Sequence, residues 1–190
     1  MRVQYSRSVA DAVWTLDASD GELLVRTGVT GRAAKMGHRL TIAMKRWTAT
    51  VRWAGDEPVS AELAVDVDSL DVVHGEGGVK GLSGAEKTLA RSNALKSLDA
   101  GRFSQIRFTA DTIYKSDDGY RLGGTLQIHG KTQDREIEVR TDDLGDAWRM
   151  CGQATVRQSD FGVKPYSLLM GSVKVADEVT VSFSAQCTKE

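Results

Sequence analysis

Strict alternation of apolar and polar residues is the feature that most constrains the fold of this chain. Residues 59–68 read VSAELAVDVD, and residues 179–185 read VTVSFSA. In both segments the large apolar side chains recur at every second position. Alternation with period two is typical of a strand that buries one face and exposes the other to solvent. The pattern therefore predicts an all-β fold with antiparallel strands.

Eight runs of this kind follow one another along the chain. They lie near residues 21–28, 38–54, 58–68, 105–115, 120–129, 135–141, 147–157 and 178–187. Short turn sequences join most of them, so we predict an eight-stranded antiparallel up-and-down barrel. A barrel of this size is either filled by side chains or holds one small ligand. We expect residues 1–190 to form a single domain.

The second run is long, and its apolar positions change phase. They are even-numbered up to Met44 and odd-numbered from Trp47 onward. A change of phase within one strand requires an extra residue, so we predict a β-bulge near Lys45 and Arg46.

One segment between the third and fourth runs has a helical pattern instead. Ser83 and Glu86 have the spacing of a capping box, in which each side chain bonds the backbone N–H of the other residue. Apolar residues then recur at helical spacing up to Leu98. We predict one inserted helix near 84–98. The glycine-rich residues 73–81 before it indicate a flexible loop, which is either a lid over the barrel mouth or a plain solvent loop.

The turn between the fourth and fifth runs, DDG at residues 117–119, allows a prediction of register. The buried positions of both runs are even-numbered, so residues that face each other must have numbers with an even sum. A three-residue loop with Gly119 in the left-handed conformation satisfies this condition. It places Phe108 opposite Ile128.

Composition narrows the class of protein. The 25 Lys and Arg residues balance 26 Asp and Glu residues, and the longest basic cluster is Lys45-Arg46. Nucleic-acid-binding proteins usually carry a basic excess or patch, so we expect no nucleic-acid partner. No apolar run has the length of a transmembrane helix or a secretory signal, so we expect a soluble cytoplasmic protein. Cys151 and Cys187 fall on opposite strand faces, which argues against a disulfide.

The glycine content supports a closed sheet. The chain has 19 glycines and 2 prolines, whereas disordered chains are usually rich in both. Glycines inside predicted strands, such as Gly124 and Gly152, indicate bends or places where a ligand passes close to the backbone.

Residue types used in catalysis and metal binding are present without the spacing that such sites need. His38, His74 and His129 form no HxH or HxxxH pair, so we expect no metal site. Ser159-Asp160 lies outside any GxSxG nucleophile elbow. We therefore expect no enzymatic activity and no cofactor.

The inward faces of the predicted strands supply a candidate site for an apolar ligand. Small residues such as Ala49, Ala110 and Ala154 recur on these faces and leave room beside the large ones. A filled core would need the same apolar residue types, so both interpretations stay open. The candidate ligand-binding residues are His38, Trp47, Trp53, Leu63, Val65, Phe108, Leu126, Ile128, Trp148, Phe161 and Phe183.

His38 has two interpretations within this set. It is a polar group that faces the ligand at the barrel mouth, near the 73–83 loop, or a residue at the start of a strand that bonds the backbone. The second interpretation is favoured.

Four segments, in the same order along the chain, resemble motifs of the YceI-like family. They are VDVDSL at 65–70, LKSLDAGRFSQIRF at 95–108, LQIHGKT at 126–132 and QSDFGV at 158–163. The resemblance spans residues 14–186 and implies a lipocalin-like barrel whose interior binds long apolar chains, such as polyisoprenoids or fatty-acid amides.

The resemblance implies a non-enzymatic protein whose partner is an apolar small molecule: an isoprenoid, a fatty acid or a fatty amide. The alternative is a barrel without ligand that acts as an interaction or stress-response module. Whether the chain forms a homodimer stays open.

Overall fold

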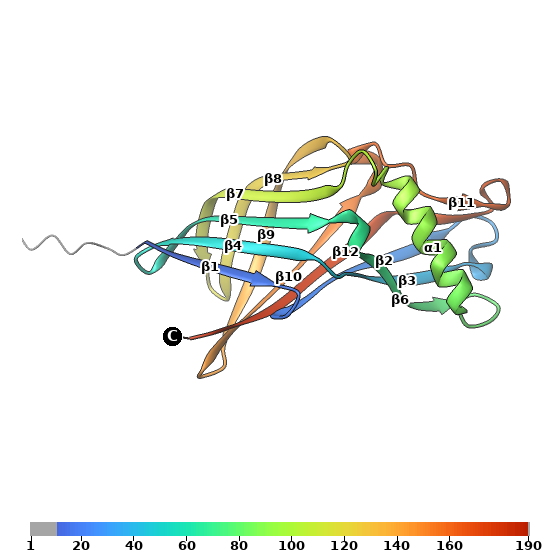
Figure 1. Ribbon diagram of the computed structural model, residues 1–190. Coiled ribbons are helices and arrows are strands. Elements are labelled where there is room, and N and C mark those ends of the chain that lie inside the picture. Colours follow the sequence, from blue (N-terminus) through green and yellow to red (C-terminus); the bar gives the residue numbers. More distant parts are fainter. Residues whose placement is uncertain (1–10, 190) are drawn as a thin grey trace, which may run out of the picture.

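The computed structural model describes residues 11–189, which form an almost entirely antiparallel β structure (Figure 1). The strands are β1 Asp11–Asp17, β2 Gly21–Thr30, β3 His38–Met44, β4 Trp47–Ala54, β5 Glu57–Asp66, β6 Leu70–Gly77, β7 Gln105–Ser116, β8 Gly119–Ile128, β9 Lys131–Asp143, β10 Ala147–Arg157, β11 Ser167–Leu168 and β12 Val173–Thr188. The α-helix of this part of the chain is α1, Gly84–Ser97. The 3₁₀ turns are η1 Ala34–Met36, η2 Val67–Ser69, η3 Gln158–Phe161 and η4 Leu169–Gly171.

The strands form one sheet that curls round on itself. Its order is β1-β4-β5-β7-β8-β9-β10-β12-β2-β3-β6, and β11 adds to β12. The chain joins the two ends of this order three times. Residues 18–20 join β1 to β2, residues 45–46 join β3 to β4, and η2 joins β5 to β6, so each of β1, β4 and β5 at one end is linked to one of β2, β3 and β6 at the other. The predicted all-β barrel is confirmed.

The number of strands differs from the predicted eight, because residues 11–189 form twelve. At Lys45 and Arg46 the chain leaves the sheet completely, where the sequence predicts a bulge. As a result β3 pairs with β2 and β6, whereas β4 pairs with β1 and β5. When the pairs β1–β2, β3–β4 and β5–β6 each count as one broken crossing and the short β11 is set aside, eight crossings remain.

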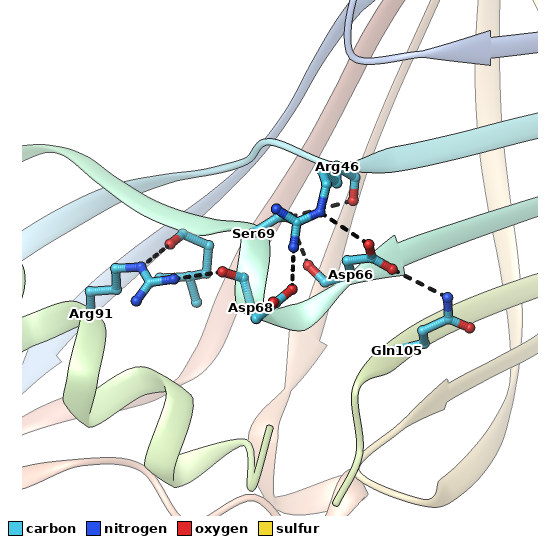
Figure 2. A network of polar contacts seen from close by, with 7 residues as sticks. Arg46, Asp66, Asp68, Ser69, Arg91 and Gln105 are labelled. Atoms are coloured by element: carbon cyan, nitrogen blue, oxygen red, sulfur yellow. Dashed lines mark hydrogen bonds and ion pairs between the residues drawn. The ribbon is translucent and has the colours of Figure 1, made fainter. Parts of the chain in front are cut away.

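A polar network holds the break between β3 and β4 beside the break between β5 and β6 (Figure 2). Nε of Arg46 donates to the Asp66 carboxylate at 3.2 Å, and a terminal nitrogen of Arg46 donates to Asp68. The Ser69 hydroxyl donates to the carbonyl oxygen of Asp66 at 2.7 Å, and the Gln105 amide donates to the Asp66 side chain at 3.2 Å. The hydrogen bond from Gln105, followed by that from Arg46, lowers the pKa of Asp66. The VDVDSL segment therefore fixes the point at which the barrel wall bends.

The predicted helix is confirmed to within one residue at its C-terminus. The Ser83 hydroxyl accepts from the backbone N–H of Glu86 at 3.3 Å, and the backbone N–H of Ser83 donates to the Glu86 carboxylate at 2.8 Å, so the capping box is present. Arg91 donates to the carbonyl oxygens of Leu70 at 2.8 Å and Asp68 at 2.6 Å (Figure 2). These bonds hold α1 beside β6 at one end of the barrel (Figure 1).

The predicted flexible loop over 73–81 is wrong for its first half. Residues 70–77 form β6, and its backbone N–H and carbonyl groups pair with those of β3 at the edge of the sheet. The following turn packs closely on His38: a Cβ at Gly78, where φ is +72°, would lie 2.4 Å from Nε2 of His38. The same nitrogen lies 2.8 Å from the carbonyl oxygen of Lys80. This turn is therefore tied to the barrel wall.

The hairpin between β7 and β8 meets the even-sum condition through a bulge within β7 and not through the length of its turn. Residues 117–118 form a two-residue turn, which by itself gives odd sums. A bulge at Asp111 then shifts the register by one residue, so that Phe108 faces Leu126 rather than Ile128. The predicted three-residue loop and its register are wrong, although the faces are correct.

Gly119 begins β8 and pairs with Ser116 instead of closing that loop. A Cβ at Gly119 would lie 2.1 Å from the carbonyl oxygen of Val139 on the neighbouring strand. A Cβ at Gly124 would lie 2.0 Å from the carbonyl oxygen of Thr109. These two glycines therefore permit close approach between strands, which is one of the roles that glycine serves inside a sheet.

Two apolar clusters close the barrel at the end near α1. One contains Trp47 and Val65, and side chains of α1 pack against it. The other is built around Phe161, which is fully buried. The register places Cys151 opposite Ser184 and Cys187 three residues further along β12, so the opposite faces predicted for the two cysteines are confirmed. Within residues 11–189, no helix is long and apolar enough to cross a membrane.

Candidate ligand-binding cavity

The barrel encloses a cavity of about 760 Å³. Side chains of β1, β2, β4, β5, β7, β8, β9, β10 and β12 line it, so strands from all round the barrel contribute to its wall. The volume lies within the range of roughly 300–1,000 Å³ that is usual for small-molecule sites. Its apolar lining includes Leu16, Leu23, Ala49, Val51, Leu63, Phe108, Ile113, Leu122, Ile137, Val139, Met150, Val181 and Phe183.

The floor of the cavity lies toward α1. Phe183 lines the cavity and packs edge-on against Trp47, with ring centroids 5.3 Å apart. Trp47 belongs to the cluster on which α1 rests. Leu16 and Leu23 are buried in the same cluster and also line the cavity. The closed end of the barrel is therefore the helix end.

Three aromatic side chains line the cavity farther from α1 than the floor does. The rings of Trp14 and Trp53 have centroids 4.6 Å apart, and Trp53 meets Tyr120 edge-on at 6.4 Å. All three are half-buried and line the cavity. The indole Nε1 of Trp53 is buried and has no hydrogen-bond partner among the described residues. Rings in this position offer a large apolar surface to a chain that enters the barrel.

Charged residues of the β4–β5 and β7–β8 turns line the cavity and mark its opening. These turns lie at the end of the barrel away from α1 (Figure 1). Asp56 comes from the β4–β5 turn, and Asp117 and Asp118 come from the β7–β8 turn. Within residues 11–189 these three carboxylates make no ion pair with a basic side chain. The basic residues of the lining are Lys115 and Arg140, and Arg140 is paired with Asp142 at 3.6 Å. The rim therefore carries an excess of negative charge.

The eleven residues proposed from the sequence occupy three different places. Five line the cavity: Trp53, Leu63, Phe108, Trp148 and Phe183. Five pack in the apolar clusters: Trp47 and Val65 in the first, and Leu126, Ile128 and Phe161 in the second. His38 begins β3 at the helix end and contacts the carbonyl oxygen of Lys80, which is the backbone-bonded arrangement.

Several lining residues were missed by sequence reasoning. Trp14 and Leu16 lie on β1, which precedes the first predicted strand although Trp14, Leu16 and the intervening Thr15 already alternate in polarity. Tyr120 and Met150 fall on the apolar face of predicted strands and are not among the eleven candidate residues. The signal that could have found them was alternation extended to the strand ends.

Other side chains of the types used in catalysis or metal binding lie outside the cavity. The Ser159 hydroxyl donates to the Asp177 carboxylate at 2.5 Å, and this bond lowers the pKa of Asp177. Across residues 11–189, no group of three or more His, Cys, Asp and Glu side chains has the arrangement of a metal site.

Comparison with known proteins supports the architecture. Among curated proteins none matches the sequence. The crystal structure of BcnA from Burkholderia cenocepacia is similar with a TM-score of 0.67 at 20% identity, covering 91% of this chain and 99% of that one. The YCEI protein of Campylobacter jejuni has a TM-score of 0.52 at 11% identity, covering 100% of this chain and 90% of that one. At these identities the likeness shows a shared fold.

The sequence itself carries the assignment to a family. The model of the YceI-like domain matches residues 14–187, which is nearly the whole described chain. The four motifs noted above lie within this match, and the barrel has the fold of the similar structures. The chain belongs to the YceI-like domain family.

Proposed function

We propose that the chain binds one long apolar ligand, of the isoprenoid or fatty-amide class, inside the barrel and catalyses no reaction on it. The observation that carries this proposal is the cavity of about 760 Å³ with its largely apolar lining. Removing each methylene group from water contributes about 0.8 kcal/mol, so a long chain needs few polar contacts to bind. Membership of a family of barrels that bind apolar ligands supports the same function.

The alternative function is an interaction module without a ligand, and it would be favoured by an interior filled with side chains. The wall residues leave space instead, because Ala49, Ala61, Gly152 and Ala154 all line the cavity. This space favours the binding function over the alternative.

Native mass spectrometry with oleamide as the probe tests the proposal. Ala154→Phe fills the cavity from β10, whereas Thr155→Phe places the same ring on the exposed face of the same strand. We expect a one-to-one oleamide adduct with the unmodified chain and with Thr155→Phe, and at least a tenfold weaker adduct with Ala154→Phe. No adduct with the unmodified chain, or equal adducts with both variants, would refute the proposal.

A further inference from the structure

Three loops at the closed end of the barrel expose large apolar side chains. We call residues 31–37, 77–83 and 164–174 the helix-end loops. Figure 1 shows them at the end of the barrel near α1, away from the β4–β5 and β7–β8 turns. The backbone N–H of Ala33 donates to the carbonyl oxygen of Ser172 at 2.9 Å, so the first and third loops are in contact. The exposed apolar side chains are Met36, Val79, Leu168, Leu169 and Met170.

The tip of the third loop exposes two large apolar side chains whose backbone has an unfavourable, left-handed conformation. Met170 is fully exposed, and Leu169 is 62% exposed. Both residues have positive φ, +50° for Leu169 and +55° for Met170, a region that bulky residues seldom occupy. The tip is tied at its base, because the backbone N–H of Ser172 donates to the carbonyl oxygen of Leu169 at 3.1 Å. Two large apolar side chains therefore project into solvent from a hydrogen-bonded turn.

The same loops carry charge of one sign. Their 25 residues include no acidic residue and five basic ones, which are Arg32, Lys35, Lys80, Lys164 and Lys174. Lys80 contacts Glu86 of α1 at 3.7 Å, and the other four make no ion pair within the described chain. The net charge of the whole chain is −1, so positive charge is concentrated in these loops.

We propose that the helix-end loops dock the protein on a lipid surface that carries anionic headgroups. Protruding apolar side chains insert at the boundary of headgroups and acyl chains, and the basic residues around them are attracted to negative lipids. A second copy of the chain that met the same surface face to face fits less well, because it would bring two sets of five basic residues together with no acidic residue between them. Nucleic acid would explain the lysines and leave Leu169 and Met170 without a role.

Docking at this end has a consequence for the cavity. The opening lies at the opposite end of the barrel, among the turns of β4–β5 and β7–β8. A protein docked by the helix-end loops therefore holds its cavity open toward the aqueous phase. The docking proposal stands on the loops alone and does not depend on the identity of a ligand in the cavity.

Co-sedimentation of the full chain with vesicles tests the docking. The probes are vesicles of phosphatidylcholine with about a quarter phosphatidylglycerol, and vesicles of phosphatidylcholine alone. We expect binding to the anionic vesicles that falls steeply with added salt, and at least tenfold weaker binding to the neutral ones. Equal binding to both, or binding to neither, would overturn the proposal.

Variants locate the surface. Leu169→Asp combined with Met170→Asp should reduce binding at least tenfold, and Lys174→Ala should reduce it about fivefold. Leu144→Asp, at the exposed turn between β9 and β10, should leave binding unchanged and serves as the matched control. Far-ultraviolet circular dichroism checks that each variant is folded. If the double variant bound vesicles as well as the control, the helix-end loops would not be the docking surface. If the unmodified chain formed a dimer without vesicles and the double variant did not, the loops would contact a second copy of the chain and not a lipid surface.

Discussion

Arg46 and Asp66 are joined twice, once through side chains and once through the backbone. Nε of Arg46 lies 3.2 Å from Oδ2 of Asp66, and the backbone N–H of Asp66 donates to the carbonyl oxygen of Arg46 at 3.0 Å. Arg46 precedes β4 and Asp66 ends β5, so the contact lies where both strands break. At this point the chain passes from β3, which pairs with β2 and β6, to β4, which pairs with β1 and β5. The Arg46–Asp66 pair keeps β4 and β5 in register where they begin and end.

Replacing Asp66 by Asn should destabilise the fold in a pH-dependent way. Asp66 is 40% exposed, so we expect a loss of about 0.5–1 kcal/mol at neutral pH, as for other solvent-accessible ion pairs. Its pKa is lowered in the folded protein, so its contribution is complete above the unfolded pKa of about 3.9 and is lost as the pH falls through the folded value. Urea unfolding at pH 7 and at pH 3 measures the difference.

The control for this prediction is Asp134→Asn, an exposed carboxylate on β9 outside the network. It should change the free energy of unfolding by less than about 0.5 kcal/mol at pH 7. A deficit for Asp66→Asn that is as large at pH 3 as at pH 7 would contradict the role of the ionised carboxylate.

Phe161 should be the most costly side chain to remove at the closed end. Its ring is fully buried, and the guanidinium of Arg135 lies 5.6 Å from the ring centroid. Phe161→Ala should cost about 3–5 kcal/mol of unfolding free energy, because a large cavity remains. Val59→Ala, at a half-exposed strand position, should cost less than about 0.5 kcal/mol. Similar midpoints of urea unfolding for the two variants would argue against a closing role for Phe161.

The strands and the helix could be predicted because their signals are local. The capping residues Ser83 and Glu86 lie three positions apart, and the alternation of β12 is visible within seven residues. The break at Lys45 and Arg46 was visible as a change of phase. Its form was not, because a bulge and a full break differ in whether β3 and β4 share partners, and partners are set by the tertiary fold.

The division between cavity and core was beyond the reach of the sequence for a similar reason. Trp53 and Trp47 both fall on the inward face of one predicted strand, yet Trp53 lines the cavity and Trp47 packs beneath it. Alternation reports which face a residue occupies and carries no information on its height along the barrel axis. The cluster of basic residues in the helix-end loops could not be predicted from the sequence, because Lys35, Lys80 and Lys174 come from three distant segments.

The affinity for fatty amides should rise with chain length and then level off. Each added methylene contributes about 0.8 kcal/mol, which corresponds to about a fourfold lower Kd, until the chain reaches the floor at Phe183 and Trp47. Titration calorimetry with a series of saturated amides measures the slope. Ala49→Leu narrows the cavity from β4 and should move the plateau to shorter chains, whereas Thr48→Leu, which is exposed, should not. A Kd independent of chain length would contradict binding inside the barrel.

The rim should favour an uncharged headgroup over a carboxylate. Asp56, Asp117 and Asp118 surround the opening, and a fatty-acid carboxylate held there would be repelled by all three. At pH 7 and low salt we expect the amide to bind several-fold more tightly than the acid of the same chain length. Added salt should reduce this ratio, because the rim carboxylates are exposed and their field is screened.

Substitution of the rim separates this charge effect from a difference in hydrogen bonding. Asp117→Asn combined with Asp118→Asn should bring the Kd of the acid closer to that of the amide, with little change in the Kd of the amide itself. Asp71→Asn removes an exposed carboxylate from β6, at the helix end, and should leave the ratio as it is. Paired titrations of acid and amide with each variant give the ratio directly. A ratio that is the same in all three proteins would show that the rim carboxylates do not select the headgroup.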